Sequence, residues 1–272
     1  ASQAGAAFAF DRAARLYRLA LELGPRTSSG WPELQADLGE VLANAGRARE
    51  AAQAFLAAAV GQSVADSVDL QRRAAEQLLR SGLIEDGLAI LDNVLAATNL
   101  ADLAKMSKLG LYWQVLRTRW RGIAFERRDE SQITRQQLAA IDVCWSVAVC
   151  LGLVEPMRGL AFQLRHLQLA LETGEPVRVA RALAIEACYA STQAKPANLE
   201  RARHCVAEST RLANELAEPR AQAWATMADG VVAYFSGDFR KARSQCDRAQ
   251  KIWRTRTSGA FWEIANSQIF SL

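Results

Sequence analysis

The side chains that could act as nucleophiles, bases or metal ligands are few and scattered along this chain. Among its 272 residues are five cysteines and two histidines, His166 and His204. A zinc site needs clustered cysteines and histidines, and the sequence has no such cluster and no CxxC pair. His166 follows a helical apolar pattern without a serine or cysteine at helical spacing, which indicates a histidine on a polar helix face rather than a general base. We therefore expect no metal site.

Motifs that bind phosphate or carry catalysis are also missing from the sequence. The dipeptide Gly-Lys of a phosphate loop never occurs, and no GxGxxG motif follows a strand. Neither an HRD catalytic loop nor a GxSxG elbow occurs. The paired carboxylates Glu85 and Asp86 lie at a predicted turn, where helix capping is their usual role. We expect no catalytic residue and no bound cofactor in this chain.

The charge balance is only mildly basic. Thirty-three Lys and Arg residues against 29 Asp and Glu residues give a net charge of +4 at pH 7. A dedicated nucleic-acid binder usually carries a concentrated basic stripe. The arginines at 117, 119 and 121 and those at 254 and 256 form short groups, which we interpret as solvated helix edges. No apolar run reaches the ~18 residues of a membrane span, so we expect neither a nucleic-acid partner nor a membrane partner.

The cysteines indicate the compartment. They are odd in number, and each lies among small apolar residues, at Cys144, Cys150, Cys188, Cys205 and Cys246. Buried cysteines of this kind behave as small apolar side chains, and unpaired thiols are typical of reducing compartments. We expect five free thiols and a cytoplasmic protein.

Apolar residues recur at spacings of three and four along nearly the whole chain, as in the run Leu34, Leu38, Val41 and Leu42. Glycine, proline or asparagine interrupts this pattern at regular places, which are helix stop signals. The segments between these breaks predict about 13 helices, stacked as antiparallel pairs. We expect an all-α fold, one domain over residues 1–272, and a longer helix over roughly residues 100–128.

The spacing of small and large residues is typical of the tetratricopeptide (TPR) repeat. The segment 32–65 supplies Leu38 and Gly39 in its first helix, then Ala51, Phe55 and Ala58 in its second. Gly39 and Ala51 are expected to allow close helix approach, and Phe55 to fill the gap toward the next pair. The register recurs in segments 68–98 and 223–256, while 100–218 is helical but degenerate. We expect a TPR-like α-solenoid, with an irregular helical bundle as the alternative.

In a solenoid of this kind, the first helix of each pair lines the concave surface. The register places seven candidate partner-binding residues there: Glu33, Glu40, Asn44, Asp69, Arg72, Glu76 and Arg80. Their mixed charge suits a peptide carrying both signs, although these residues could equally be solvated or packed against neighbours. The late pair presents apolar residues instead, Trp224, Met227, Val231, Tyr234 and Phe235, which a peptide or another helix could cover.

Several segments resemble one family over roughly Ala4 to Leu272. They are FDRAARLYRLALELG, GRAREAAQAFLAAA, RRAAEQLLRSGLIEDGLAILDNVLAA, IDVCWSVAVCLGLVEPMRGLAFQLRHLQLAL, GEPVRVARALAIEACYAS and WEIANSQIFSL. They resemble the C-terminal helical region of large multidomain bacterial serine/threonine protein kinases of myxobacteria and planctomycetes. The runs 141–145 and 174–182 look like the best-kept stretches of that family, and no chemistry is assigned to them.

The resemblance implies that the chain is a fragment of a longer protein. It would be a non-catalytic sensor or scaffold region in signal transduction, preceded by a kinase domain and an AAA-type ATPase module that bind ATP and magnesium. Its partners would be those adjacent domains and a protein or peptide in the solenoid groove. The alternative is the helical arm of a signal-transduction ATPase that regulates transcription. On either reading, we expect unpartnered apolar faces, and a tendency to fray or self-associate, at residues 1–24 and 258–272.

Overall fold

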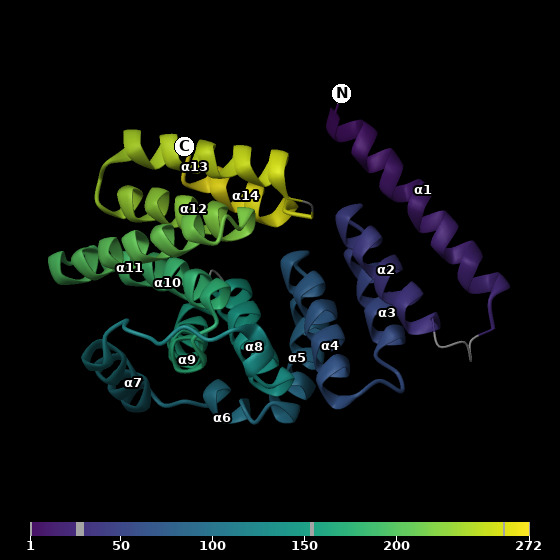
Figure 1. Cartoon of the computed structure of the whole chain (residues 1–272), viewed down its shortest axis with the longest axis horizontal. Coiled ribbons are helices and arrows are strands. Elements are labelled where there is room, and N and C mark those ends of the chain that lie inside the picture. The colour runs from purple at the N-terminus through teal and green to yellow at the C-terminus, as the bar shows by residue number, and fades with distance from the viewer. Residues whose placement is uncertain (1, 26–29, 153–154, 258, 272) are drawn as a thin grey trace. The chain divides into compact units, whose positions relative to one another are not determined.

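A computed structural model describes residues 2–25, 30–152, 155–257 and 259–271 of the chain. Over these residues it consists of fourteen α-helices and one 3-10 turn, without a β-strand (Figure 1). The expected all-α fold of stacked helix pairs is confirmed, and the helix count is close to the predicted one. The helices form two compact units, Ala1–Asp102 and Leu103–Leu272, and each unit is described here by itself.

The first unit is a row of helices in which each packs against the next along the chain. Its helices are α1 (Ser2–Leu23), α2 (Trp31–Asn44), α3 (Ala48–Ala58), α4 (Val64–Arg80) and α5 (Ile84–Ala97). Short turns join α2 to α3 and α4 to α5, so both pairs are antiparallel hairpins. Ser63 begins α4, because its side chain accepts a hydrogen bond from the backbone N–H of Asp66.

The core of the first unit depends on small residues that bring helices close together. A Cβ added at Gly39 would lie 2.7 Å from the ring of Phe55, and one at Gly87 would lie 2.7 Å from Leu79 Cγ. Phe55 is buried, and it belongs to the same core cluster as Ala74 and Leu78 of the next pair. The predicted roles of Gly39 and Phe55 are therefore confirmed.

The second unit continues the hairpin pattern. Its helices are α7 (Lys108–Arg121), α8 (Arg135–Leu151), α9 (Pro156–Thr173), α10 (Pro176–Ser191), α11 (Pro196–Glu215), α12 (Pro219–Phe235), α13 (Phe239–Arg256) and α14 (Phe261–Ile269). The main packing pairs are α8 with α9, α10 with α11, and α12 with α13. A one-turn helix, α6 (Ala101–Ala104), lies at the junction of the units, and the 3-10 turn η1 (Glu130–Gln132) precedes α8.

The prediction of one long helix over residues 100–128 is wrong. Ser107 caps a new helix, α7, by accepting a hydrogen bond from Gly110 N, and Gly122 ends that helix with a φ of +69°. The chain then crosses the turn between α9 and α10, where Arg128 N donates to Gly174 O over 3.0 Å. A Cβ at Gly174 would lie 1.9 Å from Glu126 O, so only glycine fits this crossing.

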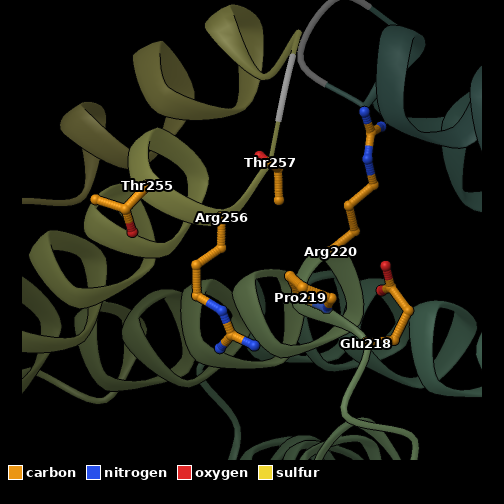
Figure 2. Close-up of a pocket in the computed structure, with 6 residues that line it drawn as sticks. All are labelled: Glu218, Pro219, Arg220, Thr255, Arg256 and Thr257. Carbon is orange, nitrogen blue, oxygen red and sulfur yellow. The ribbon is translucent and has the colours of Figure 1, made fainter.

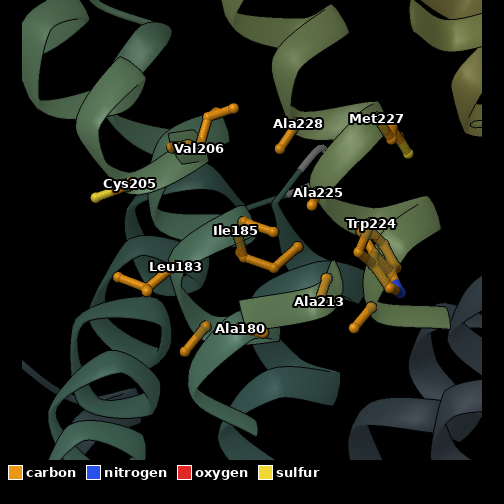
Figure 3. Packing of buried hydrophobic residues seen from close by; sticks show 14 of the residues in the cluster. Ala180, Leu183, Ile185, Cys205, Val206, Ala213, Trp224, Ala225, Met227 and Ala228 are labelled. Carbon is orange, nitrogen blue, oxygen red and sulfur yellow. The ribbon is translucent and has the colours of Figure 1, made fainter. Parts of the chain in front are cut away.

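The core of the second unit is built from alanines and branched residues of α8–α13. Figure 3 shows a part of it, with labelled residues from α10, α11 and α12. Leu183, Cys205 and Trp224 are among its members. The late repeat follows the predicted register, because Ala242, Cys246 and Ala249 are buried. A Cβ at Gly230 would lie 2.6 Å from Cys246 Sγ, which is the same close helix approach as in the first unit.

None of the described helices combines the length and the apolar character that crossing a bilayer requires. The first and last helices do expose apolar side chains. Leu16, Leu19 and Leu23 are exposed on α1, and Phe261 and Ile269 on α14. These exposed faces agree with the expectation for the two terminal segments, in which residues 1, 258 and 272 lie outside the described residues. The fraying and self-association expected there stay predictions.

Candidate functional site

Four of the predicted partner-binding residues form a continuous charged row along α4. Arg72 is bonded on both sides, with Nη2 2.7 Å from Asp69 Oδ1 and Nη1 2.9 Å from Glu76 Oε2. Arg80 Nη2 lies 2.6 Å from the second oxygen of Glu76. The side chains of Arg72, Glu76 and Arg80 are only 11%, 9% and 11% exposed. The row is therefore an ordered part of α4 in which opposite charges alternate, rather than a set of solvated side chains.

A fifth predicted residue, Glu40, joins the row through Arg73. Arg73 Nη1 lies 2.9 Å from Glu40 Oε1 on α2, and its Nε lies 2.8 Å from Asp69 Oδ2. The guanidinium carbon of Arg73 also lies 6.0 Å from the centre of the Phe55 ring. Arg73 thus connects the first helices of two successive pairs, although the repeat register does not single it out.

The remaining two candidates stand apart from the row. Glu33 is exposed in the first turn of α2, and Asn44 is the half-buried last residue of that helix. Within the described structure, neither makes a hydrogen bond or an ion pair to the row. The surface that the structure brings together consists of Glu40, Asp69, Arg72, Glu76 and Arg80, with Arg73 added.

A second charged cluster lies in the other unit, where the two family-like runs meet. Asp142 of α8 accepts hydrogen bonds from two arginines of α10: Arg178, at 3.0 Å between Nη2 and Oδ2, and Arg181. The guanidinium carbon of Arg181 lies 4.5 Å from the centre of the Trp145 ring, in a cation–π contact. The runs 141–145 and 174–182 are therefore joined by charge and by stacking.

Glu175 completes this second cluster at the start of α10. Its carboxylate accepts hydrogen bonds from the backbone N–H groups of Val177 and Arg178, at 2.9 and 2.8 Å, and so caps the helix. It also lies 3.2 Å from Arg178 Nη1. Burial by itself would lower the pKa of Arg178, but the charge and hydrogen bonds of Asp142 and the charge of Glu175 outweigh it and raise that pKa. The arginine is held as a permanent cation.

The structure corrects the prediction for His166, which is fully buried rather than on a polar helix face. Its Nδ1 and Gln163 Oε1 are hydrogen-bonded at 3.1 Å, and Gln163 Nε2 donates to Ala182 O at 3.2 Å. Nε2 has no hydrogen-bond partner within the described residues. Burial, and then the positive charge of Arg181, lowers the pKa of His166 well below its usual value. The ring is therefore neutral at physiological pH.

The apolar face of the late pair is covered by other helices. Trp224, Met227 and Val231 are buried in the core, while Tyr234 stays partly exposed and Phe235 packs at the core edge. Trp224 makes edge-on contacts with two other indoles, with ring centres 6.3 Å from Trp145 and 5.7 Å from Trp253. This face is a packing surface, in line with the second of the two expectations.

The cysteines are free thiols, as expected. Burial raises the pKa of Cys144, Cys188 and Cys205 to about 12. A thiol with such a pKa stays protonated at neutral pH and reacts slowly, because the thiolate is the reactive form. No group of three or more potential metal ligands occurs in the part of the chain that the structure describes.

A shallow pocket of about 490 Å³ lies between the start of α12 and the end of α13 (Figure 2). It is lined by Glu218, Pro219, Arg220, Thr255, Arg256 and Thr257. Its polar groups already have partners, because Glu218 caps α12 and Arg256 Nη1 donates to Gln222 Oε1 over 2.7 Å. Figure 2 shows the side chains of Arg220 and Arg256 extending in different directions. They do not converge on one ligand position.

Comparison with known proteins adds no assignment to these clusters. No protein-family model matches the chain, and no curated protein sequence matches it.

Proposed function

We propose that this chain is a non-catalytic protein-interaction region, a sensor or scaffold, of a cytoplasmic bacterial serine/threonine protein kinase. It binds a protein or peptide partner on the first helices of its pairs and contacts the adjacent kinase and ATPase domains. Protein kinase activity, ATP and magnesium belong to those domains. The resemblance of six segments to the helical region of such kinases supports this assignment.

The observation that supports the proposed binding surface best is the charged row of α4. Its central residue, Glu76, is saturated by two arginines, so it positions the row rather than binding a partner. The outer carboxylates of Glu40 and Asp69 are more exposed, and Arg73 bridges Glu40 Oε1 and Asp69 Oδ2, while Asp69 Oδ1 also pairs with Arg72. A basic side chain of a partner can compete with Arg73 for these two carboxylates. The proposal therefore favours a partner with basic residues at this place.

The first test concerns the coding sequence on either side of the chain. The proposal expects a kinase domain upstream, with a glycine-rich loop and a catalytic aspartate. An ATPase module without a kinase, together with a downstream helix-turn-helix, would contradict it and support the transcriptional alternative.

The second test is titration calorimetry between this chain and the upstream kinase–ATPase segment. The double variant Glu40→Lys/Asp69→Lys reverses both exposed carboxylates, and we expect it to weaken binding by about tenfold or more. Glu85→Lys/Asp86→Lys is the matched control with the same change of net charge, since both are exposed acids in the first turn of α5, the second helix of its pair. Equal effects of the two changes would show that only net charge matters and would reject the row as the binding surface.

A further inference from the structure

Helix α7 has a buried face that attaches it to the rest of its unit. Leu111 and Thr118 are buried on this face. Leu111 packs with Ala161 and Leu164 of α9, and Val115 lies against the same cluster. Among the described helices, α9 is the main packing partner of α7, so α7 lies at the edge of the unit (Figure 1). One side of α7 is therefore anchored, and the other is open.

The open side of α7 carries a stripe of large apolar residues. Leu109, Trp113 and Trp120 are all exposed, and the two indoles are 59% and 83% exposed. The spacing of these residues, with half-buried Leu116 between them, places them on one helix face. Tyr112 is exposed beside the stripe, with its ring centre 6.4 Å from that of Trp113. Helix α7 therefore has two apolar faces, and its own unit packs against only one of them.

Basic residues flank this stripe on both sides. With 100° per residue, Lys108 and Arg119 fall along one edge of the stripe, and Arg117 and Arg121 fall along the other. All four side chains are exposed. No aspartate or glutamate occurs between Asp102 and Glu126. The open face of α7 is therefore apolar along its centre and purely cationic along its edges.

We infer that α7 binds an anionic phospholipid surface, with its axis parallel to the membrane plane. In this position the apolar stripe enters the boundary between headgroups and acyl chains, and the indoles lie at the depth that tryptophan prefers. Lys108 and Arg117 reach the lipid phosphates, while Arg119 and Arg121 donate hydrogen bonds to Asn198 Oδ1 and to the Ala124 carbonyl and add positive charge at the edges of the face. This inference concerns attachment to one leaflet, so it differs from the expectation of no membrane partner, which considered only a spanning segment.

The composition of the face favours a lipid surface over other anionic partners. Nucleic acid is bound mainly through phosphate contacts from a basic surface, and a central stripe of leucine and tryptophan adds nothing to such contacts along a duplex. A membrane surface offers phosphates directly above an apolar layer. The alternation of a cationic edge, an apolar centre and a second cationic edge matches that layering.

The test is co-sedimentation of the 272-residue protein with vesicles of phosphatidylglycerol and phosphatidylcholine, compared with vesicles of phosphatidylcholine alone. We expect binding to the anionic vesicles, weakened by high salt. The variant Trp113→Ser/Trp120→Ser is expected to lower the partition coefficient by about tenfold or more. Lys108→Gln/Arg117→Gln removes two flanking cations and is expected to lower it by about thirtyfold.

The matched control is Phe239→Ser/Phe261→Ser, which removes two aromatic side chains that are 63% and 81% exposed, close to the values for the two indoles. It is expected to bind vesicles like the unchanged protein. Equal losses in the two aromatic variants would overturn the inference, because they would show unspecific adsorption. Absence of vesicle binding would overturn it too. Two further results would overturn the inference. One is binding to an acidic polypeptide that depends on Trp113 and Trp120 and replaces vesicle binding, and the other is self-association that does the same.

Discussion

At the scale of single residues, glycines decide how closely the helices approach. Gly39 and Gly230 each face a side chain of the partner helix at a distance that leaves no room for a methyl group. His166 affects a different property, the pH dependence of stability. Its ring is buried where α8, α9 and α10 pack together, so binding a proton there disfavours the folded state. Both effects are local, and each can be tested by one substitution.

Gly39→Ala is expected to destabilise the protein by about 1–3 kcal/mol, because the new methyl group meets the buried Phe55 ring at 2.7 Å. The measurement is the shift of the urea midpoint for the first unit. Gly30→Ala is the control, since a Cβ at Gly30 meets nothing within 4 Å and its φ of −87° suits alanine. A restored midpoint in Gly39→Ala/Phe55→Leu would identify the ring as the cause, and an unshifted midpoint in Gly39→Ala would contradict the close approach.

His166 is expected to make the protein less stable in mild acid. Its pKa is lowered on folding, so the unfolded chain binds a proton first as the pH falls below about 6.5. The contribution of His166 to the free energy of unfolding is therefore fully present above that pH. Below it, this contribution falls, by about 2 kcal/mol between pH 7 and pH 5. Urea titrations across this range measure the loss.

His166→Gln removes the titrating group, and its stability should change less over the same pH range. His204→Gln is the control, because His204 is exposed, and its pH profile should match that of the unchanged protein. An identical acid response in all three proteins would show that His166 is not the source.

At the scale of helices, the periodic apolar pattern was enough to predict most of the fold. Hairpins, the register of segment 32–65 and the close contact of Gly39 with Phe55 follow from residue size and spacing along the chain. The long helix over 100–128 was wrong because two local signals, the Ser107 cap and Gly122, outweigh the continuing apolar pattern.

Contacts between helices were harder to predict. Arg73 binds Glu40 across 33 residues, and Asp142 binds Arg178 across 36. Both pairings depend on how two helices cross, which spacing within one helix does not reveal. The burial of His166 has the same origin, since α9 is covered by α7, α8 and α10, whereas periodicity identifies a single packed face.

Glu76 and Glu40 are expected to differ sharply in their contribution to stability. Glu76→Gln leaves two arginines, each only 11% exposed, without their shared counter-charge, and we expect a loss of about 3 kcal/mol. Glu40→Gln removes a solvent-exposed ion pair that is worth about 1 kcal/mol or less. Thermal unfolding of both variants tests this, and equal shifts would contradict the buried character of the row.

At the scale of the whole molecule, the chain consists of two compact units with separate cores. The cluster around Phe55 belongs to the first unit, and the cluster around Trp224 belongs to the second. Quasi-linear helix arrays derive their stability from contacts between neighbouring pairs. Each unit therefore contains the contacts that its own hairpins need.

Fragments 1–102 and 103–272, expressed separately, are each expected to be helical and to unfold cooperatively. Circular dichroism during thermal unfolding measures both properties. Leu42→Ala in fragment 1–102 and Leu183→Ala in fragment 103–272 are each expected to lower the free energy of unfolding by about 2–5 kcal/mol. A loss of this size would show that the fragment forms its native core. An unfolded or non-cooperative fragment 1–102 would contradict its independence.

The three edge-on indoles of the second unit give this protein an uneven optical signature. Trp145, Trp224 and Trp253 lie with neighbouring ring centres 6.3 and 5.7 Å apart, which is close enough for their excited states to couple. The first unit holds one tryptophan, Trp31, outside any such group. Near-ultraviolet dichroism and tryptophan emission will therefore report unfolding of the second unit, while unfolding of the first unit changes both signals only slightly. A dye attached to an added cysteine in the first unit would make its transition visible.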